Sequence, residues 1–231
     1  MTLSSPTLPV LLKQYQPAIL LWLAAMTLAA QPCSAQATRT VEFSPLIGAY
    51  VPTAQLPGEP IGCWAVAGLS CRSSRQQNSA IALGGRASVW VGKGIALEGS
   101  LWYSPSTITG EISTSLNGAL LSRETSEGPA GVVATNVRLL VSLTRGAGSW
   151  AYVVGGPALV SRFGDAHADF PGIARFGGMV GAGAHLRVAR SLAIRAEVEQ
   201  YLYSVQGYHQ QDFVLSVGLS VASRVVSAPT P

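Results

Sequence analysis

Residues Ser79 to Tyr103 alternate apolar side chains with small or polar ones along two limbs joined by Gly92-Lys93-Gly94. Because a β-strand points successive side chains to opposite faces, each limb predicts a strand with one apolar and one small or polar face. The glycines at the joint supply the positive φ that a tight hairpin turn needs. The polar face carries Arg86 and Glu98. These charges suit a narrow, hydrated or salt-bridged interior, and they form a candidate cross-strand pair whose contact depends on the register.

The same alternation recurs along the chain and predicts eight strands. They cover Thr40–Val51, the two limbs of the hairpin, Val132–Thr144, Trp150–Ser161, Ala174–Val188, Leu192–Ser204 and Asp212–Ser223. Long polar connections alternate with tight turns, so that the long connections share one end and both termini lie at the other. Residues Ile112 to Leu121, inside one long connection, are expected to extend the strands that flank them. This arrangement predicts an all-β fold, an eight-stranded antiparallel up-and-down transmembrane β-barrel with short periplasmic turns and longer outer loops.

The composition agrees with a barrel wall that meets lipid. The chain is 48% hydrophobic and only 11% charged, against a usual charged share of roughly 25%. A lipid-facing barrel hides its hydrophobicity in alternation, without the long apolar runs of membrane helices. The net charge of +4 is modest and its basic residues are scattered, which indicates no nucleic-acid partner.

The N-terminus has the order of a secretory signal peptide. Lys13 precedes an apolar run of 13 residues, Ala18–Ala30, and Cys33-Ser34-Ala35 supplies a small-residue cleavage site. The run is short for a transmembrane helix of about 20 residues, so an uncleaved anchor is the lesser alternative. We expect cleavage after Ala35, a barrel over residues 36–223 and a disordered tail over residues 224–231.

Two cysteines remain after the leader. Cys63 and Cys71 lie eight positions apart in a Gly/Pro-rich segment of an exported chain, which predicts one loop disulfide. The alternative is a pair of free thiols. Neither cysteine has a histidine nearby, so we expect neither a metal site nor another cofactor.

The opening segment VEFSPLIGAYVPTAQL, the repeated eight-strand layout and the glycine-studded segments Trp150–Ser161 and Ala174–Val188 carry a resemblance. The chain resembles the small outer-membrane β-barrel family, the group similar to the OmpA membrane domain and OmpW-like proteins, over Thr40 to Ser223. The resemblance implies a monomer in the bacterial outer membrane. One departure concerns assembly, since such proteins often end on a terminal aromatic residue, whereas the last strand here ends at Val221-Ala222-Ser223.

Nine ionisable side chains fall on the face predicted to line the lumen. They are Glu42, Arg86, Glu98, Arg138, His185, Arg187, Arg195, Glu197 and Glu199. Charges in such a confined space must pair or stay hydrated, because an unpaired buried ion is very costly. An eight-stranded barrel is narrow enough for side chains to fill, which favours a salt-bridged plug. The alternative is a gated passage for a small solute.

The predicted function is structural, or interaction with a surface partner through the outer loops Pro52–Asn78 and Ser104–Ala130, without catalysis. Three alternatives remain open: a narrow channel for small solutes, a lipid-modifying enzyme, and a soluble periplasmic lipocalin-like binder. The enzyme would use His167 near Ser161, or His209 near Ser204, with Asp165, Asp169 and Asp212 as available acids. It would need a base within hydrogen-bond reach of the serine and a third group to orient that base, and loop residues of these types also occur by chance.

Overall fold

The computed structural model describes residues 39–53, 69–144, 148–164, 174–205 and 208–225. Residues 40–223 form one compact unit. A second unit, residues 1–39 and 224–231, contains only residues 39, 224 and 225 of the described part. The described part of the chain contains no helix with the length and hydropathy to cross a membrane.

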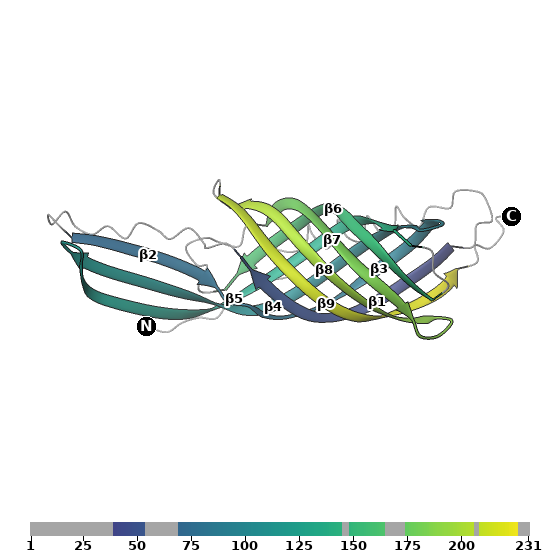
Figure 1. Ribbon diagram of the computed structural model, residues 1–231, viewed down its shortest axis with the longest axis horizontal. Coiled ribbons are helices and arrows are strands. Elements are labelled where there is room, and N and C mark those ends of the chain that lie inside the picture. The colour runs from purple at the N-terminus through teal and green to yellow at the C-terminus, as the bar shows by residue number, and fades with distance from the viewer. Residues whose placement is uncertain (1–38, 54–68, 145–147, 165–173, 206–207, 226–231) are drawn as a thin grey trace, which may run out of the picture. The chain divides into compact units, whose positions relative to one another are not determined.

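Nine β-strands make up the described chain. They are β1 (Arg39–Pro52), β2 (Leu69–Gln77), β3 (Ala80–Gly92), β4 (Ile95–Leu116), β5 (Ala119–Ser142), β6 (Ser149–Phe163), β7 (Arg175–Arg187), β8 (Leu192–Val205) and β9 (Tyr208–Val225). Eight of them hydrogen bond in a ring, in the order β1-β3-β4-β5-β6-β7-β8-β9 and back to β1. The predicted eight-stranded antiparallel barrel is confirmed (Figure 1). β9 continues to Val225, two residues into the predicted tail.

The strands β4 and β5 run beyond the barrel and form a three-stranded extension with β2. In the ring, β3 pairs with β4 only as far as Tyr103 of β4, and β6 pairs with β5 only from Gly131 of β5 onward. Past these points β4 and β5 keep pairing to the turn at Asn117-Gly118, where both residues have positive φ, as a two-residue hairpin turn requires. The predicted extension of the flanking strands by Ile112–Leu121 is therefore confirmed (Figure 1).

The strand β2 corrects the prediction that residues 52–78 are all loop. It pairs with residues 108–116 of β4 and satisfies backbone groups along an edge that would otherwise be open. Its sequence, LSCRSSRQQ, has no apolar alternation. The hydrophobic pattern could not reveal this strand, because its side chains are almost all polar.

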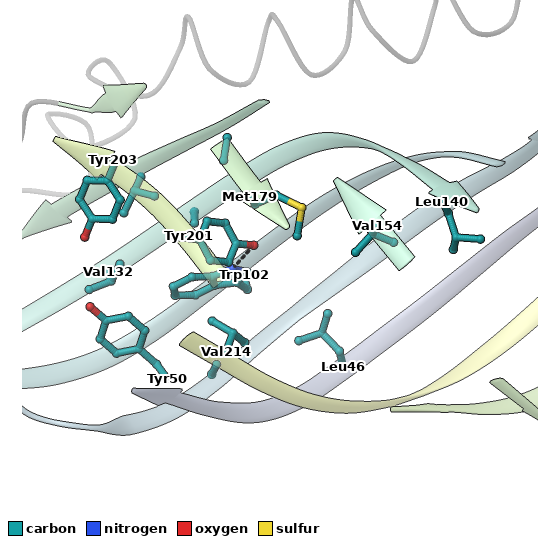
Figure 2. Close-up of a cluster of buried hydrophobic side chains, with 14 of the residues drawn as sticks. Leu46, Tyr50, Trp102, Val132, Leu140, Val154, Met179, Tyr201, Tyr203 and Val214 are labelled. Atoms are coloured by element: carbon teal, nitrogen blue, oxygen red, sulfur yellow. Dashed lines mark hydrogen bonds between the residues drawn. The ribbon is translucent and has the colours of Figure 1, made fainter. Parts of the chain in front are cut away.

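The two faces of the barrel wall differ as the alternation predicts. Large apolar side chains point outward and remain exposed, among them Phe43, Ile47, Ile81, Leu83, Leu101, Leu139, Val180, Val198, Leu215 and Leu219. The inward face is filled by aromatic, charged and small residues. Figure 2 shows Tyr50, Trp102, Tyr201 and Tyr203 gathered at one end of the inner cluster, with Leu140 and Val154 toward the other.

One inward glycine makes room for a large side chain. A Cβ on Gly183 would lie 2.3 Å from the ring of Tyr152, closer than real Cβ contacts allow. Gly183 of β7 thus leaves the space in which Tyr152 of β6 passes over β7 to reach Arg195 and Glu197 of β8. Glycine at inward positions of a small barrel relieves crowding of this kind.

Candidate functional site

Three arginines and three glutamates form a dense ion-pair network in the barrel interior. Arg138 of β5 lies at its centre, and its Nε donates to Oε1 of Glu98 at 2.7 Å. Its Nη1 lies 2.7 Å from Oε1 of Glu197 and 2.9 Å from Oε1 of Glu199. One guanidinium therefore contacts carboxylates from two strands, β4 and β8.

The other two arginines complete the network. Arg195 lies beside Glu98 and Glu197, with Nη2 3.0 Å from Oε1 of Glu98 and 2.8 Å from Oε2 of Glu197. Arg86 donates to Glu199 and lies 3.5 Å from Oε1 of Glu197. The six side chains are at most 2% exposed, and their formal charges sum to zero. Such close mutual pairing is what offsets the desolvation of buried ions.

The register of the paired strands decides which of these charged side chains are in contact. Arg86 lies opposite Ser100, and Glu98 lies opposite Ser88, so the candidate pair Arg86–Glu98 is not directly opposed. Arg86 instead contacts Glu199 across the lumen. Glu98 lies opposite Arg138 and is paired with it.

Two tyrosines flank the network and donate hydrogen bonds to two of its carboxylates. Tyr152 accepts a hydrogen bond from Arg195 Nε at 2.6 Å and donates one to Glu197 Oε2 at 2.6 Å. Tyr201 donates to Glu199 Oε2 at 2.5 Å and accepts from Trp102 Nε1 at 2.8 Å (Figure 2). The plugged interior is therefore a continuous set of charged and aromatic side chains.

A second buried ion pair was missed by the sequence analysis. Arg162 Nη2 lies 3.0 Å from Oδ2 of Asp212, which also accepts a 2.5 Å hydrogen bond from the Tyr203 hydroxyl. Arg162 was assigned to a polar connection, and Asp212 to the start of a strand. Asp212 lies two and four residues before the inward residues Val214 and Ser216. The period-2 alternation of a strand would therefore have placed Asp212 on the inner face as well.

The remaining three predicted lumen charges lie apart from the network. Glu42 Oε2 accepts a hydrogen bond from Ser220 Oγ at 3.2 Å. The His185 ring stacks on Trp150, with centroids 4.6 Å apart, and Arg187 is exposed at the end of β7. The structure thus brings six of the nine predicted residues together and places these three nearer the tight turns.

The candidate catalytic residues do not assemble in the described chain. Ser204 and His209 are register partners on exposed positions of β8 and β9, but Asp212 is buried and paired with Arg162. His167 lies outside the described residues, as do residues 1–38 with the predicted leader. Within the described ranges, no group of three His, Cys, Asp or Glu side chains could hold a metal ion.

The predicted disulfide stays a prediction. Cys71 lies in β2, with Sγ 3.7 Å from the Thr114 hydroxyl, and Cys63 lies outside the described residues. If the bridge forms, it joins the segment before β2 to the extension.

The closed ring, the apolar outer face and the polar plugged interior together define a transmembrane β-barrel. Closure pairs the backbone groups of every wall strand, which a hydrocarbon environment requires.

Several solved structures with this architecture are similar to the chain. The N-terminal β-barrel domain of Pseudomonas aeruginosa OprF is 12% identical, with a TM-score of 0.47, covering 80% of this chain and 97% of that one. Neisserial surface protein A is 9% identical, with a TM-score of 0.49, covering 79% and 96%. OprG from Pseudomonas aeruginosa is 9% identical, with a TM-score of 0.48, covering 82% and 98%. No protein-family model and no curated protein sequence matches the chain. The class therefore rests on the strand pairing and on the two faces of the wall.

Proposed function

We propose that this chain is a monomeric bacterial outer-membrane barrel with a closed lumen, which acts through the extension formed by β2 and the far ends of β4 and β5. The observation that carries the proposal is the continuous pairing of β4 and β5 past the ring, from Ser104 to Leu116, with β2 added alongside. A sheet of this size outside the barrel wall has no part in crossing the membrane. Its surface is therefore available for contact with a partner.

The extension has the features of a contact surface. Leu120 and Leu121 are 62% and 60% exposed beside the hairpin turn. Arg123 and Glu111 form an exposed pair with Nη2 and Oε2 2.6 Å apart. Exposed apolar side chains beside charged ones are a common composition for protein interaction sites.

The closed interior supports a non-conducting role over the channel alternative. Arg86 and Arg138 contact carboxylates of β8, and Arg195 of β8 contacts Glu98 of β4, so ion pairs span the lumen. We therefore expect no single-channel conductance in planar bilayers from the native chain. Steady ohmic steps from purified protein would favour the channel.

We propose no catalytic role, because the Ser204–His209 pair has no acid to orient the imidazole in the described chain. Asp212 is held by Arg162 and Tyr203 on the inner side of the wall. Lipid A profiles that stay unchanged in a His209→Ala strain are the expected result.

Cysteine labelling in intact cells tests the orientation and the exposure of the extension. A chain with Cys63→Ser and Cys71→Ser would carry either Leu120→Cys, in the extension, or Lys93→Cys, in the turn between β3 and β4. A membrane-impermeant maleimide should label the Leu120→Cys chain in intact cells and the Lys93→Cys chain only after lysis.

The opposite labelling order would reverse the proposed orientation. Protection of both sites in intact cells would remove the surface role. Heat-modifiable migration of each variant from the outer-membrane fraction shows that the barrel has folded.

A further inference from the structure

A cavity of about 550 Å³ opens at the tight-turn end of the barrel. Its wall includes Trp90 of β3, Trp150 of β6 and His185 of β7, and Lys93, Arg187 and Glu42 also line it. We call this cavity the vestibule. Its volume lies within the range of about 300–1,000 Å³ that is usual for small-molecule sites.

Deeper in the barrel, the vestibule meets the ion-pair network. Trp150 packs on Tyr152, with ring centroids 5.2 Å apart, and Tyr152 is hydrogen bonded to Arg195 and Glu197. A molecule that enters from the tight-turn end thus meets a closed network of side chains. The vestibule is a blind pocket, which favours binding over passage.

Aromatic rings form much of the vestibule wall. Trp90 and Trp150 meet edge to face, with centroids 5.3 Å apart at 75°. The His185 ring also stacks on Trp150, with ring centroids 4.6 Å apart and an interplanar angle of 27°. Both indoles are only half-buried, so they keep surface that a flat or ring-shaped ligand can cover. Aromatic surfaces of this kind contribute binding energy through both area and ring geometry.

The charges around the vestibule favour an anion. Lys93 and Arg187 are exposed, so both cations are available to a ligand. The carboxylate on the lining, Glu42, is buried and accepts a hydrogen bond from Ser220. Two cations on the lining thus outnumber one carboxylate, and the cations are the more exposed.

We propose that the vestibule binds a small ring-shaped carboxylate. The ring covers the indoles of Trp90 and Trp150, and the carboxylate lies between Lys93 and Arg187. Aromatic acids and sugar acids both combine a carboxylate with a ring that has an apolar face. In a sugar acid, that ring is the pyranose. The proposal concerns the opposite end of the barrel from the extension and stands independently of the extension's role.

Calorimetric titration of the full chain, folded in non-ionic detergent, tests the proposal. The probes are benzoate and glucuronate, each compared with an uncharged counterpart, benzamide or methyl glucoside. We expect at least one acid to bind about fivefold more tightly than its counterpart, since an exposed ion pair contributes up to about 1 kcal/mol. Binding by benzoate alone would identify an aromatic acid, and binding by glucuronate alone a sugar acid.

Variants at the rim separate a built site from general attraction. Lys93→Gln and Arg187→Gln should each weaken binding by up to about fivefold. Arg190→Gln is the matched control, because Arg190 is an exposed cation in the β7–β8 turn that does not line the vestibule. Equal losses in all three variants, or binding by neither acid, would overturn the proposal.

The aromatic wall needs a variant of its own. Trp150→Leu keeps an apolar side chain but removes the ring that stacks on His185, and it should weaken the acids and their uncharged counterparts alike. Heat-modifiable migration shows whether this variant has folded. A folded Trp150→Leu chain that binds the acids as tightly as the native chain would contradict the role given to the ring.

Discussion

Replacing Glu98 with glutamine should expose how strongly the interior network stabilises the barrel. Glu98 is the main carboxylate partner of Arg138 and Arg195, at 2.7 Å from Nε of the first and 3.0 Å from Nη2 of the second. At an effective dielectric constant near 20, one such contact at about 3 Å is worth roughly 5 kcal/mol before desolvation is counted. Glutamine keeps the shape and one acceptor oxygen but leaves the buried site with a net positive charge.

We expect Glu98→Gln to lower the free energy of unfolding by about 3–5 kcal/mol, the usual result of removing one partner from a buried ion pair. The matched control is Glu111→Gln, which breaks the exposed pair with Arg123 and should cost about 0–1 kcal/mol. Adding Arg195→Gln to Glu98→Gln restores charge balance. The double variant should therefore be more stable than the sum of the single changes predicts, by about 0.5–3 kcal/mol.

The assay is urea unfolding of the barrel in lipid vesicles, followed by tryptophan fluorescence and by heat-modifiable migration. A cost of Glu98→Gln no larger than that of Glu111→Gln would refute a tightly paired, dry interior. Such a result would mean that water reaches the network and solvates the unpaired arginines. It would also favour the channel over the closed barrel.

Two further substitutions test the packing and the outer face. Gly183→Ala should destabilise the barrel by about 1–3 kcal/mol, because its Cβ would lie 2.3 Å from the Tyr152 ring. Gly178→Ala on the same strand is the control, since its nearest neighbour would be 3.9 Å away, and equal effects would contradict the close-contact argument. Leu83→Arg should cost about 2–4 kcal/mol in vesicles if Leu83 lies near the bilayer midplane. Leu120→Arg, in the extension, should cost almost nothing, and a similar loss at both sites would place the extension in lipid.

The alternation of side chains made the barrel and its inner face predictable. Arg86, Glu98, Arg138, Arg195, Glu197 and Glu199 all lie on the face that period 2 assigns to them. Their pairing was not predictable, because it depends on register, and β3 contains a bulge between Trp90 and Gly92 just before the turn. A local shift of this kind changes which residues are opposed without changing the hydrophobic pattern.

The parts that the sequence did not reveal share a physical reason. The strand β2 consists almost entirely of polar residues, so no apolar periodicity marks it. Arg162 and Asp212 lie toward strand ends, where strand boundaries are the least certain part of any sequence-based assignment. The cleavage site after Ala35 and the Cys63–Cys71 bridge stay predictions.

The long sequence separation within the ion-pair network has a consequence for assembly. Arg86 and Glu199 are 113 residues apart, and Arg195 and Glu98 are 97 apart, so these contacts form only when strands from both halves of the chain have come together. A one-residue slip of β8 would turn Glu197 and Glu199 toward lipid, at high cost. We therefore expect the network to stabilise the correctly closed wall and to favour no other register of β8.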